Sequence, residues 1–188
     1  MAETRITAGE FRGRVVHTPR GMAVRPTRSM VRASLFNILG DRVIDARVLD
    51  LYAGAGTLGF EALSRGADQV VFVDHDARSL GCIAATAAEF RCAERCDLVA
   101  AEVLRHLRRA GAELCRFDIA FLDAPYRDPE LEQVLETLGE HPPALVVCEH
   151  HERRRIAETA GSLVRFRQVR HGLTTLSLFH PAAETTSA

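Results

Sequence analysis

From Arg47 onward, the sequence alternates short apolar runs with helical patterns, and this alternation constrains the fold more than any other feature. Apolar strands separated by helices are typical of a parallel β-sheet with helices on both faces, because parallel neighbours need a crossover connection. The chain is therefore predicted to be an α/β protein. The expected strands are 47–52, 69–74, 97–100, 117–122 and 144–149, and the expected helices are 57–65, 77–91, 103–110, 129–138 and 152–160.

The end of the chain departs from this alternation. Two further strand patterns, 163–169 and 174–179, flank Gly172, and the interval between them is too short for a helix. They are predicted to pair as an antiparallel hairpin. A mostly parallel seven-stranded sheet that ends in an antiparallel hairpin is the layout of the Rossmann-like methyltransferase fold rather than of the dinucleotide-binding fold.

The first 46 residues stand apart from this pattern. Residues 4–18 alternate well enough for a small β-ribbon, and 28–39 has the apolar side of a helix. A chain of 188 residues is long enough for one domain with a sizeable core, and too short for two. We therefore expect a basic N-terminal extension at 1–46, a methyltransferase domain at 47–181 and a disordered tail at 182–188.

Positive charge gathers at the N-terminus of a chain whose formal net charge is −1. All 24 basic residues are arginines, and the first 32 residues contain seven of them against two glutamates. A basic arm on a near-neutral domain is typical of nucleic-acid contact, because arginine binds phosphates in a bidentate manner. A solvated arm without a ligand is the alternative. The candidate nucleic-acid contacts are Arg12, Arg14, Arg25, Arg28 and Arg32.

A glycine-rich turn joins the first expected strand of the sheet to the helix that follows it. Gly54, Gly56 and Gly59 form a GxGxxG pattern, and glycine is needed where the backbone turns sharply beside a ligand. This pattern alone does not separate a nicotinamide site from a methyl-donor site. It does predict that a nucleoside cofactor binds at this turn.

Asp50 favours the methyl donor, because its carboxylate would repel a pyrophosphate and attract the sulfonium and ammonium of S-adenosylmethionine. Asp74 ends the next strand, where a carboxylate can accept both ribose hydroxyls. Glu102 is placed to accept from the adenine amino group, beside the Val103 amide. The predicted cofactor is S-adenosylmethionine. Its candidate contacts are Asp50, Tyr52, Ala53, Gly54, Gly56, Asp74, His75, Glu102 and Val103.

The tetrapeptide Asp123, Ala124, Pro125 and Tyr126 follows the strand expected at 117–122 and is the candidate catalytic segment. The lone pair of an exocyclic base amine is delocalised into the ring. Two acceptors aimed at its hydrogens, the Asp123 carboxylate and the Ala124 carbonyl, would favour the attacking geometry. Tyr126 would stack on the base. The alternative is an ordinary turn, which also prefers Asp and Pro.

The remaining composition argues against a metal site and against a membrane protein. The five cysteines are scattered without a CxxC pair, so we expect neither a metal site nor a disulfide framework. No apolar stretch approaches the ~20 residues that span a bilayer, and the N-terminus lacks the apolar core of a signal peptide. We therefore expect a cytoplasmic protein without membrane contact.

In the residues of its N-terminal stretch and glycine loop, the chain resembles the bacterial small-subunit (16S) rRNA guanine-N2 methyltransferases, the RsmD-type family. The N-terminal matches are Arg5-Ile6, Gly9, Arg12-Gly13-Arg14, Arg25-Pro26-Thr27, Arg32 and Leu35-Phe36-Asn37, and the cofactor loop and helix match over 49–54 and 61–67. The resemblance implies transfer of a methyl group from S-adenosylmethionine to the N2 amine of a guanine. It also implies small-subunit ribosomal RNA or the assembling 30S particle as the partner, and we expect a monomer.

The chain departs from this family's pattern at three places. Ala124 replaces the first proline of the usual Asp-Pro-Pro-Tyr or Asp-Pro-Pro-Phe, Ser29-Met30 replaces Asp-Arg, and Ala33 replaces a glutamate. These changes cluster where the substrate is expected. Two alternatives therefore stay open: a methyltransferase that acts on adenine N6 or another nucleic-acid amine, and a catalytically decayed relative that binds RNA or the ribosome.

Overall fold

The computed structural model describes residues 4–19, 27–126 and 128–182, with Thr27 and Arg28 described by their backbone only. Within these ranges no helix is long and apolar enough to cross a membrane. The strands are β1 (Thr4–Arg5), β2 (Val15–Val16), β3 (Arg47–Leu51), β4 (Gln69–Asp74), β5 (Cys96–Ala100), β6 (Ile119–Leu122), β7 (Leu145–His151), β8 (Thr159–Ala160), β9 (Leu163–His171) and β10 (Thr174–Pro181). The α-helices are α1 (Thr27–Leu39), α2 (Thr57–Ser64), α3 (Ala77–Phe90), α4 (Val103–Ala110) and α5 (Leu131–Glu140), with short 3₁₀ turns at Gly40–Val43, Ala93–Arg95 and Gly111–Arg116.

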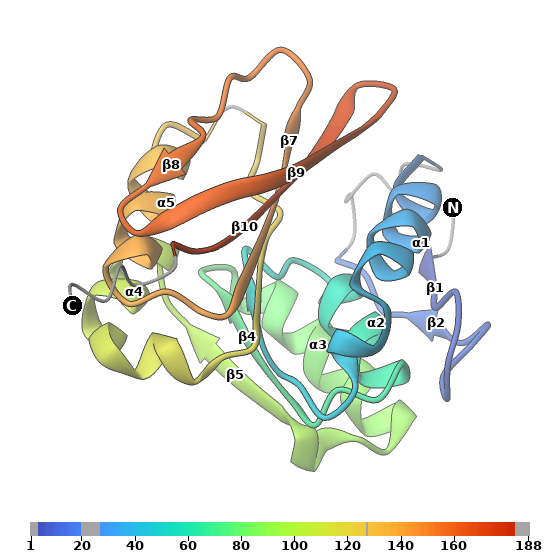
Figure 1. Cartoon of the computed structure of the whole chain (residues 1–188). Coiled ribbons are helices and arrows are strands. Elements are labelled where there is room, and N and C mark those ends of the chain that lie inside the picture. Colours follow the sequence, from blue (N-terminus) through green and yellow to red (C-terminus); the bar gives the residue numbers. More distant parts are fainter. Residues whose placement is uncertain (1–3, 20–26, 127, 183–188) are drawn as a thin grey trace.

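The main sheet has eight strands in the order β5-β4-β3-β6-β7-β10-β9-β8. The five strands from β5 to β7 are parallel, and β10, β9 and β8 each pair antiparallel to their neighbour. This confirms the predicted α/β fold with a terminal antiparallel hairpin (Figure 1). The strand order reverses between β3 and β6, and in such sheets ligands bind outside the carboxyl ends of the strands at this switch point.

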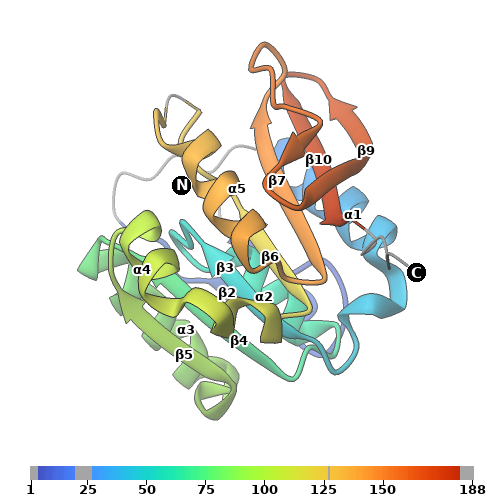
Figure 2. The ribbon, with the colours of Figure 1, turned by 60° about the vertical axis from the view of Figure 1, so that its left-hand side comes forward.

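Helices cover both faces of the sheet, and each face has its own hydrophobic cluster (Figures 1 and 2). Strand side chains alternate between the clusters: Val48 joins the cluster of α1, α2 and α3, whereas Leu49 and Leu51 join that of α4 and α5. Parallel strands buried on both faces are expected to be apolar; β6 is apolar throughout, whereas β3 contains the buried Asp50. Asp50 is therefore an exception that needs an explanation.

The N-terminal extension does not form a separate core. Ile6, Phe11 and Val16 belong to the same hydrophobic cluster as α1, α2 and α3. Strands β1 and β2 form the predicted small ribbon, and Thr86 of α3 accepts a 3.0 Å hydrogen bond from the His17 amide. The extension is thus packed against the helices that follow the cofactor loop.

The helix expected at 152–160 is wrong. Residues 152–154 form turns, and Thr159–Ala160 forms the short strand β8 beside β9, which raises the strand count from the expected seven to eight. Only Ile156 and Ala160 of this segment are buried, which is too narrow an apolar stripe to hold a helix. The Arg165 guanidinium also donates a hydrogen bond to the Ile156 carbonyl at 2.8 Å, so this carbonyl is bound by a side chain of β9 rather than by a helical amide.

Candidate active site

The glycine loop follows β3 and has the tight geometry that its sequence predicts. Tyr52, Gly54 and Gly56 all have positive φ, of 59°, 55° and 73°. The Ala53 amide donates to the Val73 carbonyl at 3.1 Å, which ties the loop to β4. A Cβ at Gly59 would lie 2.2 Å from the ring of Phe72, so only glycine allows α2 to approach the sheet this closely.

Asp50 lies beneath this loop rather than on its open side. Its side chain is buried, and Oδ2 accepts the Gly59 amide at 2.9 Å in the first turn of α2. Burial raises the pKa of Asp50 well above its usual value, the Gly59 hydrogen bond opposes this shift, and the nearby Asp123 and Asp74 raise the pKa further. Asp50 therefore steadies the start of α2, and its buried side chain presents almost no surface to a ligand.

Asp74 ends β4 and is held in place by the loop itself. Its Oδ2 accepts the Gly54 amide at 2.7 Å, and its Oδ1 accepts the Asp76 amide at 2.8 Å. A carboxylate has about four lone-pair directions, so two remain for ribose hydroxyls. The exposed His75 ring lies beside it, with Nδ1 3.8 Å from Asp74 Oδ1.

Glu102 and Val103 follow β5 at the start of α4. Glu102 is exposed and its side chain makes no capping hydrogen bond, whereas Val103 is buried. Because β5, β4 and β3 are neighbours in this order, Glu102, Asp74 and the glycine loop lie along one edge of the sheet. These residues fit S-adenosylmethionine, because they place carboxylate acceptors for the adenine and the ribose beside a tight glycine turn.

The tetrapeptide follows β6, on the other side of the switch point from the cofactor loop. Asp123 is half-buried and Ala124 is buried, while Pro125 is exposed. The Tyr126 hydroxyl and Thr174 Oγ1 are hydrogen-bonded at 2.9 Å, and the Tyr126 ring packs edge-on against His151 at 5.3 Å. Tyr126 is thus anchored to the ends of β7 and β10.

Two residues near this site, Glu149 and Thr174, were not identified from the sequence. Glu149 directly follows Cys148, which is the register partner of Leu122, the residue before Asp123, so Glu149 and Asp123 occupy adjacent chain positions near the carboxyl edge of the sheet. Glu149 is buried at 8% exposure. Its position at the carboxyl end of β7 is a signal that the strand-end rule could have used. Thr174 gave no such signal, because only the hairpin brings it to Tyr126.

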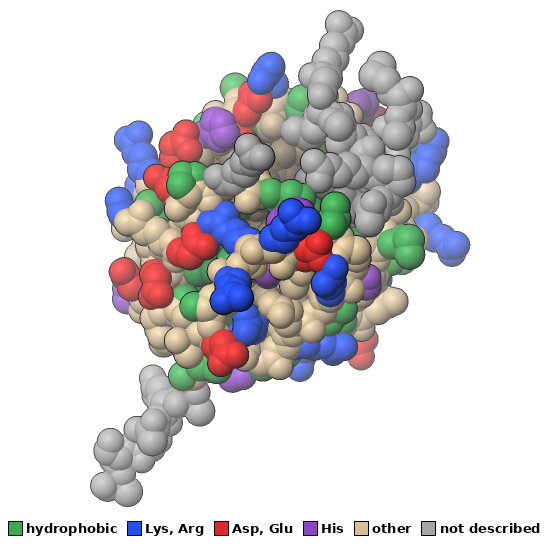
Figure 3. All heavy atoms as spheres, turned by 90° about the horizontal axis from the view of Figure 1, so that it is seen from above, with side chains coloured by type: hydrophobic (Ala, Val, Ile, Leu, Met, Phe, Trp, Pro, Cys, Tyr) green, Lys and Arg blue, Asp and Glu red, His purple; other side chains and the backbone are tan. Residues whose placement is uncertain are grey.

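The candidate nucleic-acid contacts differ in their exposure. Arg12 is exposed, and Arg14 lies over the Phe90 ring at 4.2 Å while donating to the Glu89 carbonyl. Arg25 and the Arg28 side chain lie outside the described residues. Figure 3 shows the end of the molecule above the carboxyl edge of the sheet, where arginine side chains are interspersed with acidic ones.

Arg32 has a different place from the one expected. It is only 5% exposed, and its Nε donates to Glu61 Oε2 at 3.0 Å. Its guanidinium also donates to the Arg5 carbonyl at 2.6 Å. We therefore correct its interpretation from an RNA contact to a buried structural pair.

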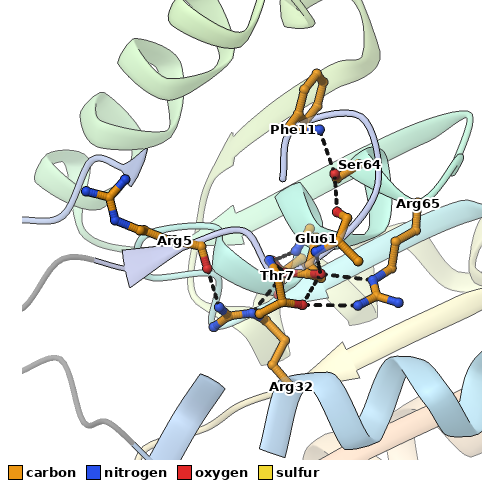
Figure 4. A network of polar contacts seen from close by, with 10 residues as sticks. Arg5, Thr7, Phe11, Arg32, Glu61, Ser64 and Arg65 are labelled. Atoms are coloured by element: carbon orange, nitrogen blue, oxygen red, sulfur yellow. Dashed lines mark hydrogen bonds and ion pairs between the residues drawn. The ribbon is translucent and has the colours of Figure 1, made fainter. Parts of the chain in front are cut away.

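Glu61 of α2 is the centre of a buried network that the sequence analysis did not identify (Figure 4). It accepts hydrogen bonds from the Thr7 amide at 2.9 Å, the Thr7 hydroxyl at 2.6 Å, Arg32 and Arg65. Burial raises the pKa of Glu61, but the bonds from Thr7 and Arg65 and the charge of Arg32 outweigh it, so the net shift is downward. The network joins the N-terminal ribbon, α1 and the helix of the cofactor loop.

The cysteines do not form a metal site in the described part of the chain, where no group of three or more His, Cys, Asp or Glu side chains could hold an ion. Cys92 is buried, and the Cys96 thiol donates to its carbonyl at 3.2 Å. The Cys96 thiol therefore contacts the backbone, and the Cys92 thiol is packed in the interior.

Known proteins resemble the chain over nearly its whole length. The family model described as Conserved hypothetical protein 95 matches residues 4–180. The chain is 31% identical over 179 residues to "Putative rRNA methyltransferase YlbH" of Bacillus subtilis, which covers 93% of this chain and 97% of that protein. It is 34% identical over 152 residues to "Ribosomal RNA small subunit methyltransferase D" of Haemophilus influenzae, which covers 78% of each.

The fold agrees with these sequence matches. The solved structure "Putative methyltransferase yhhF from Escherichia coli" superimposes with a TM-score of 0.85 and 28% identity, over 97% of this chain and 100% of that one. Because the family model spans most of the sequence and the relatives exceed 30% identity, the chain belongs to the Conserved hypothetical protein 95 family, the family of the RsmD-type methyltransferases.

Proposed function

We propose that this protein transfers a methyl group from S-adenosylmethionine to the N2 amine of a guanine in small-subunit (16S) ribosomal RNA. Its family membership supports an S-adenosylmethionine-dependent rRNA methyltransferase. One observation carries the proposal. Strands β3 and β6 are neighbours at the switch point, so the glycine loop after β3 lies beside the tetrapeptide that begins at Asp123. The proposal extends to a monomer that acts in the cytoplasm on this RNA or on the assembling 30S particle.

The cofactor would be held by residues at the ends of three adjacent strands. Asp74 would accept the ribose hydroxyls, Glu102 and the Val103 amide would bind the adenine edge, and the carboxylate of Asp50 would stabilise the donor's positive charge. When bound, S-adenosylmethionine supplies an electrophilic methyl group on a sulfonium. The loop amides and the buried Asp50 keep this site preorganised, because their positions are set before the substrate arrives.

The chain's own residues would prepare the amine for attack. The Asp123 carboxylate and the Ala124 carbonyl would each accept a hydrogen bond from the amine. These two bonds would direct the nitrogen lone pair towards the methyl group of S-adenosylmethionine. Asp123 would then take the proton that the methylated amine loses. Tyr126 would stack on the base, and its hydrogen bond to Thr174 sets the plane of the ring. Ala124 contributes through its backbone, so the replaced proline leaves this acceptor in place.

The decisive experiment is single-turnover methyl transfer to small-subunit particles that lack the modification, with mass mapping of the modified nucleoside. Asp123→Ala should lower the rate by about 10²–10³, the cost of removing one preorganised polar group. Tyr126→Ala should weaken base stacking by roughly 1–3 kcal/mol, whereas Tyr126→Phe retains the ring and loses the hydrogen bond to Thr174.

Three results would overturn this assignment. Full activity of Asp123→Ala would exclude the proposed role of its carboxylate. A methylated adenine in place of N2-methylguanine would move the protein to the alternative adenine-N6 class. No transfer by the natural chain to any small-subunit substrate would favour the decayed, RNA-binding alternative.

A further inference from the structure

Residues of α1 and β9 line a groove. Helix α1 lies on the face of the sheet opposite to α4 and α5 (Figures 1 and 2). The volume of the groove is about 590 Å³, within the range of roughly 300–1,000 Å³ that is usual for ligand sites. From α1 it is lined by residues on one side of the helix, including Met30, Ala33 and Asn37, and from β9 by alternate residues, Arg167, Val169 and His171.

The chemistry of this groove suits a single-stranded nucleotide. Met30 is 72% exposed, an unusual exposure for a large apolar side chain, and with Val169 it offers a surface for a base. Asn37 and His171 supply hydrogen-bonding groups. Among the described residues that line the groove, none is acidic.

Arg167 is the arginine of β9 that is available to a phosphate. Arg165 is paired with Glu158, and Arg170 is paired with Glu152. Arg167 is exposed and forms no ion pair within the part of the chain that the structure describes. A cation without an internal partner, at the rim of a groove without acidic lining, is complementary to an anion.

The groove is continuous with the tetrapeptide site. His171 and Ser34 are hydrogen-bonded at 2.8 Å across the groove, and His171 is also the register partner of Thr174. The Thr174 hydroxyl is in turn bonded to Tyr126. The groove therefore begins where the ring of Tyr126 is anchored, and extends along β9 away from the cofactor edge.

We propose that the groove between α1 and β9 binds the RNA nucleotides next to the target base, with a base against Met30 and a phosphate on Arg167. This inference rests on the proposed function, because it assumes that the target base stacks on Tyr126. It assigns target selection to α1 and the hairpin. In contrast, the chemistry is carried out at the ends of β3 and β6. Met30 and Ala33, both of which depart from the resembled family's pattern, line this groove.

The test uses the full chain and small-subunit rRNA transcribed in vitro, with Kd measured by filter binding at several salt concentrations. Arg167→Glu should raise Kd by about tenfold, as expected for a lost hydrogen bond to a charged group. It should also lower the salt dependence of log Kd by about one unit, since one phosphate contact is lost. In single-turnover methylation at saturating RNA, the rate should stay at the wild-type level.

Arg108→Glu is the matched control, because Arg108 is an exposed arginine of α4 on the other side of the sheet. It makes the same change in net charge and should leave Kd and its salt dependence near wild type. Met30→Ser should raise Kd about threefold without changing the salt dependence, because it removes an apolar contact and not a charge. Because Met30 is exposed, Met30→Ser should leave the fold intact, and thermal unfolding checks this.

Equal effects of Arg167→Glu and Arg108→Glu, or none from either, would overturn the groove as an RNA site. Wild-type RNA affinity with a changed thermal midpoint or oligomeric state would also overturn it, and would indicate that another part of the chain or a second copy fills the groove. If the wild-type protein methylates no RNA but its binding still depends on Arg167, the groove stands and the proposed function fails. If the wild-type protein methylates the RNA while the Kd of Arg167→Glu is unchanged, the groove alone fails.

Discussion

At the scale of single residues, the buried Asp50 lowers the stability of the fold, while the proposed function gives it a role in cofactor binding. Its carboxylate is 2% exposed and is near Asp74 and Asp123, so burial and like charge both raise its pKa. An acid whose pKa is higher in the folded state binds protons more readily when folded. Its contribution to the free energy of unfolding therefore falls as pH rises from the unfolded value of 3.8 through the raised folded value.

Asp50→Asn tests this trade-off. The asparagine oxygen can still accept the Gly59 amide, but the buried charge is gone, so the thermal midpoint should rise at pH 7. The gain should shrink towards pH 4, where the wild-type carboxyl is increasingly protonated in both states. Binding of S-adenosylmethionine should weaken by about tenfold or more, as for lost interactions with a charged group. Unchanged affinity in calorimetry would show that Asp50 serves only α2.

At the scale of elements, the Glu61 network determines how the N-terminal ribbon and α1 lie on the cofactor helix. Glu61 is fully buried and paired with Arg32, which is itself 5% exposed (Figure 4). Removal of one partner from a buried ion pair leaves the other charge without compensation. Because α2 begins at the glycine loop and the network also holds α1, its loss should disturb the positions of both the loop and α1.

Glu61→Gln should therefore lower the free energy of unfolding by about 3 kcal/mol, as measured by urea denaturation. The control is Glu132→Gln. Glu132 pairs with Arg154 at a side-chain exposure of 53%, and breaking such a surface pair should cost less than about 1 kcal/mol. A similar loss in both variants would mean that the network adds nothing beyond an ordinary surface pair.

At the scale of the whole molecule, cofactor binding should stabilise one cooperative unit, because the extension and the sheet share a hydrophobic cluster. Saturation with S-adenosylhomocysteine at 100 times its Kd should add about 2.7 kcal/mol. For a chain of this length, that corresponds to a rise of roughly 5–10 °C in Tm. Asp74→Asn should reduce the rise, since it removes charge from the ribose acceptor. Stabilisation by NAD and none by S-adenosylhomocysteine would contradict the cofactor assignment.

Local patterns in the sequence were sufficient to predict the geometry of the glycine loop. The strand, turn and helix around Gly54, Gly56 and Gly59 depend on interactions between near neighbours, so they could be predicted. The N-cap of α3 at Asp76 is equally local, because its side chain accepts the Arg78 amide. Strand ends in a parallel sheet meet at one edge, so Asp74 and the tetrapeptide after β6 could also be placed together.

The sequence by itself thus determined the α/β fold, the glycine loop and the order of the strand-end residues. These features follow from hydrophobic periodicity and from turn-forming residues, and both are encoded over a few neighbouring positions. Only the tertiary structure decided which arginines are free. Arg32 is buried against Glu61, 29 residues away, and no local pattern indicates that pairing. The same holds for the lost helix at 152–160, for the bond between Tyr126 and Thr174, and for the groove beside Arg167. Each of these depends on contacts between distant segments, whose free energy outweighs the local propensity that a sequence displays.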